Sequence, residues 1–468
     1  MSPPRHVAVI DIGKTNAKLA LVDLQRLEEI AVVTRPNAVL PGPPWPHFDT
    51  EGHWQFLLQA LEEFHRLYGI DAISVTTHGA SIVLLDKAGD LAAPVLDYEH
   101  SIPAEIASDY DRLRPPFERT GSPRLAGGLN VGAQLHYQFA LDPDLHHRTR
   151  HIIGYPQYWG YRLTGAVAND VTSIGCHTDL WEPQEDRFSS LVADLGISGK
   201  MAPVRQSGEV LGTLLPGIAA ATGLWPDTPV VCGIHDSNAS LYPHLLAQTG
   251  PFSVVSTGTW VIVMAIGGSR PALDPHRDTL VNVNAMGNPV ASARFMGGRE
   301  FEIIQDGYPF APSAQDVAEV LSRNIMLLPA VEPGTGPFQG QQMRWHGGFP
   351  QGQPPACGTG HRSVALSYYL ALMTETCLEL TGATGPTIVE GPFAQNPYFL
   401  AMLAAATGRP VLQSRTATGT SIGAALLCGG SGALLSPLPA TAHGADATLS
   451  TYAANWKRLR SMVPPSNL

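Results

Sequence analysis

A short pattern of strand, glycine turn and strand occurs twice in this chain, about half a chain apart. The first copy is the apolar run His6–Asp11, a turn at Gly13–Asn16, and a second apolar run at Ala17–Asp23. The second copy is PFSVVSTGTWVIVMAIG at residues 251–267. Two halves that open alike predict two related domains, which we divide into residues 1–245 and 246–468; no repeat of short period accompanies them.

Strands alternate with helices on both sides of that boundary, which predicts an α/β chain. The stretch Pro333–Gly360 is rich in glycine and proline, and we expect an irregular surface insertion there. Helices are expected at Glu51–Tyr68, Asn130–Leu141, Tyr155–Leu163, Ser237–Leu246, Arg362–Leu380, Pro397–Thr407 and Gly419–Cys428, and strands at Glu29–Arg35, Asp71–Thr76, Pro229–Gly233, Pro386–Val389 and Pro410–Gln413.

Composition excludes several other classes of protein. The chain has 468 residues, of which 44% are hydrophobic and 15% charged, so it is not a disordered chain. Its formal net charge of -11 argues against a nucleic-acid-binding surface. The five cysteines are widely spaced and include no C-x-x-C pair. No apolar stretch reaches the length of about 18 residues that spans a membrane, and we expect a cytoplasmic protein.

The first turn, Asp11-Ile12-Gly13-Lys14-Thr15-Asn16, could hold a phosphate chain, because such turns aim N–H groups and a hydroxyl at anions. A carboxylate at Asp11 would repel phosphates unless Mg²⁺, held through water, lay between them. An ordinary hairpin explains the same residues equally well. The segment is not a Walker A loop, because the glycine required five positions before Gly13 is replaced by Ala8.

The second turn, Ser256-Thr257-Gly258-Thr259-Trp260, has the same setting. Glycine and threonine turns are common, so one such turn indicates little by itself. Two turns in corresponding places of two half-chains could hold a triphosphate from opposite sides.

Gly233-Ile234-His235-Asp236-Ser237 lies between an expected strand and an expected helix. Asp236 could accept a hydroxyl proton during phosphoryl transfer, or it could simply cap the helix. His235 could bind a polyol, or it could be structural. The segment Gly391–Asn396 also joins a strand to a helix, where glycine permits close approach to a flat ring. An ordinary loop is the alternative there.

Together these segments resemble the FGGY family of carbohydrate kinases, and they occur in the order found in that family. Within the family, the DIGKTNAK opening and the His235–Asp236 pair are most similar to the L-fuculokinase and rhamnulokinase type of ketose kinase. The matching segments are Ile10–Asp23, Thr77–Asp86, Tyr161–Gly165, Gly233–Ser240, Val255–Trp260, Gly391–Asn396 and Thr418–Leu427.

The resemblance implies two actin-like (ribonuclease H-like) ATPase domains with a cleft between them. It implies the sugar site, the first phosphate loop and the catalytic aspartate in the N-terminal domain, and the second phosphate loop and the adenosine site in the C-terminal domain. The implied roles are these: Asp236 as general base; Asp11 near Mg²⁺ through water; Gly13, Lys14, Thr15 and Asn16 in the first phosphate loop; Thr257, Gly258 and Thr259 in the second; His78, Gly79, Tyr98, His235, Asp236 and Asn284 at the sugar; and Gly391 and Asn396 at the adenosine.

The implied activity is transfer of a phosphoryl group from ATP, with Mg²⁺, to a hydroxyl of a ketose or deoxyketose such as L-fuculose or L-rhamnulose. The alternatives are another sugar or polyol of the family, such as xylulose, ribulose or a glycerol-like substrate, and a non-kinase ATPase of the actin and heat-shock fold. We expect a small-molecule sugar as partner, no nucleic acid and no membrane, and leave room for a homodimer.

The chain departs from the family pattern at two places. Pro392 stands where the family usually has a second glycine after Gly391, and proline lacks an N–H group. The segment Leu96–His100 differs from the usual tryptophan–aspartate segment, which indicates a sugar pocket unlike those of the glycerol and xylulose types.

Two further patterns suggest other chemistry. Gly419–Gly423 fits the G-x-S-x-G motif of serine hydrolases, but only His443 and Asp446 follow it, in the reverse of the usual order. His146, His147 and His151 could bind a metal, although no carboxylate or cysteine pattern joins them, and a solvated helix face explains them better.

Overall fold

The computed structural model describes residues 4–348, 353–414, 419–429, 438–439 and 446–461. The chain forms two compact units. The first contains Met1–Ala247, Val281–Pro289 and Thr418–Leu435, and the second contains Gln248–Leu280, Val290–Ala417 and Ser436–Leu468. Each unit therefore contains more than one segment of the chain, and two short segments from beyond residue 247 belong to the first unit.

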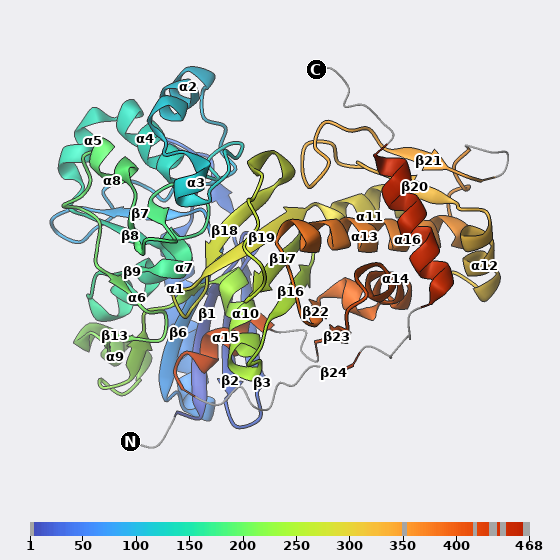
Figure 1. Ribbon diagram of the computed structural model, residues 1–468. Helices are drawn as coiled ribbons and strands as arrows, with labels where there is room; N and C mark the ends of the chain where they lie inside the picture. Colours follow the sequence, from blue (N-terminus) through green and yellow to red (C-terminus); the bar gives the residue numbers. More distant parts are fainter. Residues whose placement is uncertain (1–3, 349–352, 415–418, 430–437, 440–445, 462–468) are drawn as a thin grey trace. The chain divides into compact units, whose positions relative to one another are not determined.

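The first unit is built on a sheet with strand order β13-β14-β6-β1-β2-β3, in which β15 also pairs with β6 (Figure 1). β1, β2 and β3 are antiparallel, whereas β6 runs parallel to β1, and β14 and β15 run parallel to β6. The strands are β1 (His6–Ile12), β2 (Asn16–Asp23), β3 (Glu28–Pro36), β6 (Ala72–Thr77), β13 (Val210–Thr213), β14 (Pro229–Val231) and β15 (Ile234–His235).

Both faces of this sheet are covered, which explains why β1 is an unbroken apolar run. Ala8 and Ile10 pack in one cluster with Leu57 of helix α1 (Thr50–Tyr68). Val7 and Val9, which point to the other face, share a cluster with residues of α15 (Gly419–Leu426). Helix α10 (Asp236–Ala247) packs against α15.

The remaining elements of the first unit are shorter and lie outside the main sheet. The strands are β4 (Val39–Leu40), β5 (His47–Phe48), β7 (Ile82–Leu85), β8 (His151–Gly154), β9 (Asn169–Asp170), β10 (Trp181–Glu182), β11 (Arg187–Phe188) and β12 (Val204–Arg205). The helices are α2 (Ala104–Leu113), α3 (Phe117–Thr120), α4 (Val131–Leu141), α5 (Pro143–Arg148), α6 (Tyr155–Thr164), α7 (Val171–Ile174), α8 (Ser190–Asp194) and α9 (Pro216–Thr222).

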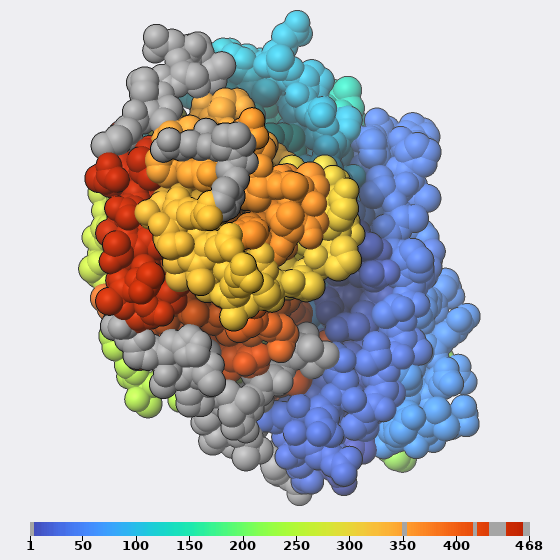
Figure 2. Space-filling view, turned by 90° about the vertical axis from the view of Figure 1, so that its right-hand side faces the viewer, coloured from blue at the N-terminus to red at the C-terminus, as the bar shows by residue number. Residues whose placement is uncertain are grey.

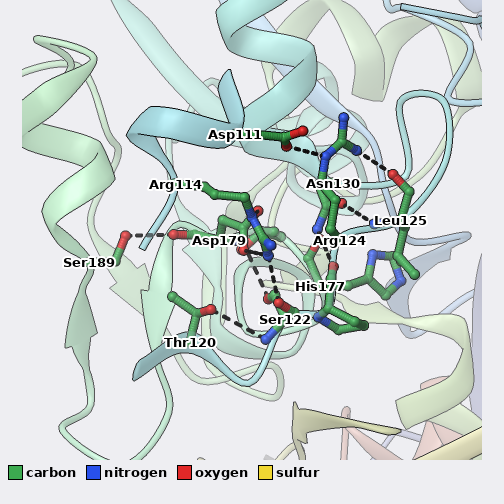
Figure 3. A network of polar contacts seen from close by, with 12 residues as sticks. Asp111, Arg114, Thr120, Ser122, Arg124, Leu125, Asn130, His177, Asp179 and Ser189 are labelled. Carbon is green, nitrogen blue, oxygen red and sulfur yellow. Dashed lines mark hydrogen bonds and ion pairs between the residues drawn. The ribbon is translucent and has the colours of Figure 1, made fainter. Parts of the chain in front are cut away.

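A buried ion pair fixes the irregular segment between α3 and α4 (Figure 3). The Arg114 guanidinium donates to both carboxylate oxygens of Asp179, at 2.9 and 3.2 Å, and also to the carbonyl of Ser122. Asp179 is fully buried and accepts a further hydrogen bond from Tyr110. Asn130 closes the same segment by bonding to the backbone of Leu125, Pro123 and His177.

The second unit repeats the order of the first. Its sheet runs β18-β19-β17-β16-β22-β23-β24, and β16 pairs antiparallel with β17 and parallel with β22, as β1 does with β2 and β6. The predicted α/β fold of two sheet-bearing domains is therefore confirmed. The strands of this sheet are β16 (Phe252–Thr257), β17 (Val261–Ile266), β18 (Thr279–Val283), β19 (Pro289–Phe295), β22 (Thr387–Glu390), β23 (Val411–Gln413) and β24 (Leu438–Pro439). The adjoining ends of β18 and β19 fall in the segment Val281–Pro289 of the first unit.

Helix α13 (Gly360–Leu380) lies at the centre of the second unit. It is buried over most of its length and packs against α11, α12 and α14. Helix α16 (Ala447–Arg460), red in Figure 2, packs against α14 and β20, where Tyr452 and Trp456 donate to backbone carbonyls of Ile325 and Leu327. The other elements are η1 (Pro275–Arg277), α11 (Gly297–Gln305), α12 (Ala314–Ser322), β20 (Met326–Leu328), β21 (Arg344–His346), η2 (Pro392–Gln395) and α14 (Pro397–Thr407).

The expected insertion at Pro333–Gly360 is only partly irregular. Its strand β21 pairs antiparallel with β20, and Phe338 is buried in the core of the unit. A three-residue strand is too short to show a period of two, so the sequence gives little sign of it. Residues 349–352 of this stretch lie outside the described residues.

Replacing Asp179 with Asn should lower the free energy of unfolding by about 3–5 kcal/mol, because it leaves the Arg114 charge buried without its counter-charge. Asp109→Asn removes a partner of Arg112 at an exposed pair on α2 and should change it by less than about 0.5 kcal/mol. Urea unfolding followed by circular dichroism measures both. Equal effects of the two variants would contradict the structural role assigned to the buried pair.

Candidate functional site

Three neighbouring parallel strands of the first unit end together. Thr76 of β6 is the register partner of both Asp11 on β1 and Ile234 on β15, and the backbone N–H of His78 donates to the carbonyl of Ile12 at 2.8 Å. Polar residues at the ends of adjacent parallel strands meet at one edge of the sheet. Asp11, near the end of β1, and His78 and Asp236, which follow β6 and β15, therefore lie at the same edge. The sheet therefore brings together residues from three separate stretches of sequence.

Asp236 is the first residue of α10, and its side chain is 34% exposed. Its carboxylate accepts from the backbone N–H of Ser237 at 2.6 Å, at the end of the helix where negative charge is stabilised. Nε2 of His235 lies 3.2 Å from the same carboxylate. A Cβ atom on residue 79 would lie 2.6 Å from that nitrogen, so glycine at position 79 allows the close approach of His235.

His78 lies in an aromatic pocket formed by Phe48, Tyr98 and Tyr155, with ring-centroid distances of 5.0–5.3 Å. Burial lowers the pKa of His78 below its usual value, so the ring is neutral. Nδ1 lies 2.9 Å from the carbonyl of Gly79 and must carry the hydrogen there, because a carbonyl only accepts. Nε2 is then an acceptor, and it is buried without a hydrogen-bond partner among the described residues.

Asp11 faces a lysine that the sequence analysis did not single out. Nζ of Lys18 lies 3.2 Å from the Asp11 carboxylate, 3.3 Å from Glu29 and 2.7 Å from Oγ of Ser421. Burial raises the pKa of Asp11, Asp236 and Glu29 raise it further, and Lys18 lowers it. The register pairs Asp11 directly with Lys18 across the hairpin, so a strand alignment of the sequence could have found this contact.

The first turn is closed by a backbone bond from Gly13 N–H to the carbonyl of Asn16 at 2.9 Å, and the side chains of Thr15 and Asn16 are exposed. Asn37, which directly follows β3, supports this turn: its Nδ2 donates to the carbonyl of Gly13, and its backbone N–H donates to the carbonyl of Thr15. Asn37 Oδ1 accepts in turn from Nε2 of His53 at 2.7 Å.

Lys14 belongs to this turn, but its ammonium group lies with the aromatic pocket. It pairs with Asp97 and, at 3.1 Å, with Glu99. It also lies over the rings of Tyr98 and Phe48, 4.7 and 5.3 Å from their centroids. Asp97, Glu99, Phe48 and Tyr155 are thus pocket residues that the sequence analysis did not assign, although Asp97 and Glu99 fall in the segment that departs from the family pattern.

Asn284, expected at the sugar, shapes a turn. Its Oδ1 accepts from the backbone N–H groups of Met286 and Asn288, both at 3.0 Å, and its side chain is buried in the first unit.

The other predicted nucleotide residues lie in the second unit. Thr257 bridges two strand ends, because its hydroxyl donates to the carbonyl of Glu390 and accepts from Phe393 N–H at 3.1 Å. Gly258 and Thr259 form the exposed turn between β16 and β17. Gly391 has φ +77°, and a Cβ there would lie 1.9 Å from the carbonyl oxygen of Thr257, so only glycine fits. Asn396 caps α14 through the N–H groups of Tyr398 and Phe399.

The G-x-S-x-G motif and the three histidines noted in the sequence form no reactive site among the described residues. Ser421 of the G-x-S-x-G motif is fully buried and bonded to Lys18, and its suggested partner His443 lies outside the described residues. His146 bonds to the carbonyl of Leu195, and the described part of the chain has no cluster of three side chains that could hold a metal ion. Within that same part, no helix is both long enough and apolar enough to cross a membrane.

Residues 6–242 match the family model described as the FGGY family of carbohydrate kinases, N-terminal domain, and residues 249–436 match that of carbohydrate kinase FGGY, C-terminal domain. The chain belongs to the FGGY family of carbohydrate kinases. The resemblance inferred from the sequence motifs is therefore confirmed.

Related FGGY proteins support this placement. A carbohydrate kinase from Novosphingobium aromaticivorans has a solved structure with a TM-score of 0.90 and 35% identity, covering 98% of this chain and 99% of that chain. L-Fuculokinase of Escherichia coli (strain K12) is 28% identical over 276 residues, which are 55% of this chain and 56% of that protein. The chain thus spans little more than half the length of that fuculokinase. Autoinducer-2 kinase of Yersinia pseudotuberculosis serotype O:3 is 22% identical over 463 residues, 91% of this chain and 86% of that protein.

His53 helps to support the first turn through Asn37, and it should make the stability of this FGGY chain depend on pH. Burial lowers the pKa of His53 from 6.5 to about 4, because its ring is enclosed beside Arg35, which donates to Nδ1 at 2.8 Å. Between these pH values only the unfolded state binds the proton, so the free energy of unfolding falls as pH falls, by at most about 1.4 kcal/mol per pH unit.

His53→Gln should flatten the fall in unfolding free energy between about pH 6.5 and pH 4, as measured by urea unfolding at a series of pH values. His147→Gln, on the exposed side of α5, is the control and should retain the wild-type slope. A His53→Gln curve parallel to the wild-type curve would show that His53 does not remain neutral in the folded protein.

Proposed function

We propose that this chain transfers the γ-phosphoryl group of ATP to a hydroxyl of a ketose or deoxyketose of the L-fuculose type. The observation that carries the proposal is the partly exposed Asp236 carboxylate at the start of α10, beside His235 and next to the aromatic pocket of His78. Membership of the FGGY family supports ATP as the phosphoryl donor and a sugar as the acceptor.

Asp236 is the proposed general base. As the sugar oxygen forms its bond to the γ-phosphorus and the bond to the ADP oxygen breaks, the hydroxyl proton passes to the Asp236 carboxylate. His235 lies beside that carboxylate, with its Nε2 3.2 Å away. Burial lowers the pKa of His235, so its ring is neutral. Ser237 N–H fixes the carboxylate from the helix side. Positioning of this kind supplies most of the catalysis in phosphoryl transfer.

Asp11 is the residue proposed to hold Mg²⁺ through water. The cluster around it suits a cation, because Asp11, Glu29 and Asp236 supply three acidic groups against the single ammonium of Lys18. Mg²⁺ commonly uses one or two carboxylates and keeps several of its waters, so a larger protein ligand set is unnecessary. When bound, the ion neutralises the charge that develops on the phosphates.

The choice of sugar in this proposal is based on the substrates named for the related kinases. L-Fuculokinase supports a deoxyketose, although the similarity covers only part of each chain. Autoinducer-2 kinase matches along nearly the whole chain and supports the alternative, another polyhydroxyl substrate of the family. A coupled assay of ADP release over ketoses, deoxyketoses and polyols, with sugar-free controls, separates these candidates, and it also detects a sugar-independent ATPase.

Asp236→Asn should lower turnover by about three powers of ten, because the amide cannot accept the proton, while ATP affinity stays within about threefold of wild type. Turnover is measured by ADP release, and affinity by isothermal titration calorimetry. Asp227→Asn, an exposed neutralisation in the same unit, is the control and should leave both unchanged. Near-normal turnover of Asp236→Asn would remove this residue from the mechanism.

Asp11→Asn should raise the Mg²⁺ concentration needed for half-maximal activity by about tenfold, because the water-held ion loses its carboxylate. The same shift should appear in calorimetric titrations of ATP at varied Mg²⁺, which do not depend on turnover. Asp227→Asn, an exposed neutralisation outside this acidic cluster, is the control and should leave the Mg²⁺ dependence unchanged. Equal Mg²⁺ dependence of the two variants would reject the role of Asp11.

A further inference from the structure

Lys14 occupies an unusual position for a residue of the first turn. Its backbone lies between Gly13 and Thr15, yet its ammonium group reaches the aromatic pocket and pairs with Asp97 and Glu99. The ring of Tyr98, which lies 4.7 Å from the ammonium, also packs edge-on against His78. Lys14 therefore forms part of the wall of the proposed sugar pocket.

The charge of this wall is negative despite the lysine. Asp97 and Glu99 face Lys14 directly, and Asp236 and Lys14 both act electrostatically on His78. Three acidic side chains thus accompany one ammonium group. An anionic ligand would meet repulsion from these acids, while the positive charge that could attract it is already paired.

The hydrogen-bonding groups of the pocket, like its charge, favour a neutral hydroxyl ligand over an anion. Nε2 of His78 is an acceptor without a partner among the described residues. Nδ1 of His235 is likewise buried without a partner in the described part of the chain, and it is an acceptor when the hydrogen of the neutral ring is on Nε2, which lies 3.2 Å from the Asp236 carboxylate. Hydroxyl groups can donate to such nitrogens, whereas a carboxylate has no hydrogen to donate.

We propose that the Lys14–Asp97 pair is a specificity determinant that makes this pocket select neutral polyhydroxyl ligands and reject sugar acids (aldonates) of the same carbon number. The inference rests on the proposed function, because it assigns a substrate class to the same site. Asp97 holds the lysine in its paired state; once Asp97 is neutral, Lys14 can offer its charge to a ligand carboxylate.

Asp97 and Glu99 should contribute unequally. The side chain of Asp97 is 9% exposed, whereas that of Glu99 is 64% exposed. Water and salt screen an exposed charge far more than a buried one, so Asp97 controls the pairing of Lys14 and Glu99 only assists it.

The test measures binding of neutral and acidic ligands by calorimetry, and turnover by ADP release. The neutral ligands are L-fuculose, L-rhamnulose, D-xylulose and glycerol, and the acids are L-fuconate and D-gluconate. Wild-type protein should bind at least one neutral ligand and bind the acids at least about tenfold more weakly. Asp97→Asn should shift the ratio of acid to neutral affinity by about tenfold toward the acids. Glu99→Gln should shift it in the same direction by about twofold to threefold.

Asp144→Asn neutralises an acidic residue on α5 that is 72% exposed, and it should leave the ratio unchanged. Thermal unfolding checks that each variant is folded, and Glu99→Gln keeps the proposal testable if Asp97→Asn does not fold. Acids bound as tightly as neutral ligands by wild-type protein, or an unchanged ratio in the folded variants, would overturn the inference. Neutral ligands that bind without promoting ADP release would instead refute the proposed kinase function.

Discussion

The parallel pairing of β1, β6 and β15 is the constraint on which the candidate site depends. Thr76 is the register partner of both Asp11 and Ile234, so the residues just after these strands share one edge of the sheet. A shift of the register by one residue would turn every side chain of the shifted strand to the opposite face. The apolar clusters on both faces of β1 prevent that shift, and burial of the sheet thereby positions the polar edge.

Two lysines of one hairpin pair with different acidic residues at this edge of the sheet. Lys18 pairs with Asp11 beneath α15, and Lys14 pairs with Asp97 in the aromatic pocket. The supports of this region come from remote parts of the first unit: Asn37 and His53 hold the first turn, and Gly128 N–H donates to the carbonyl of Tyr98 at 2.9 Å. Gly128 lies in the segment that the Arg114–Asp179 ion pair and Asn130 hold in place.

Much of this architecture could be predicted from the sequence, because long elements have clear periods. The sequence predicts the extent of α1, α6 and α14 to within two residues, and the apolar runs of β1 and β16 identify the two sheets. The ends of β1 and β6 are recognisable from polar residues that follow apolar ones. The two-residue strand β15 is not predicted, because the sequence places Ile234 and His235 between an expected strand and an expected helix. The pairing of Lys14 with Asp97 could not be predicted from the sequence, because these residues are far apart in the chain and periodic patterns relate only residues that are close in sequence. Asn284 shows another limit: the sequence does not reveal that its Oδ1 accepts two hydrogen bonds within its own turn. Its place at the sugar remains a prediction.

The role of Asp236 is tested by a structure determined with a non-hydrolysable ATP analogue and the sugar that best promotes ADP release. We expect one sugar hydroxyl to lie within about 2.6–3.2 Å of an Asp236 carboxylate oxygen, with the γ-phosphorus in line beyond that hydroxyl. A sugar held elsewhere, with neither a direct contact nor a single water linking any hydroxyl to Asp236, would contradict it.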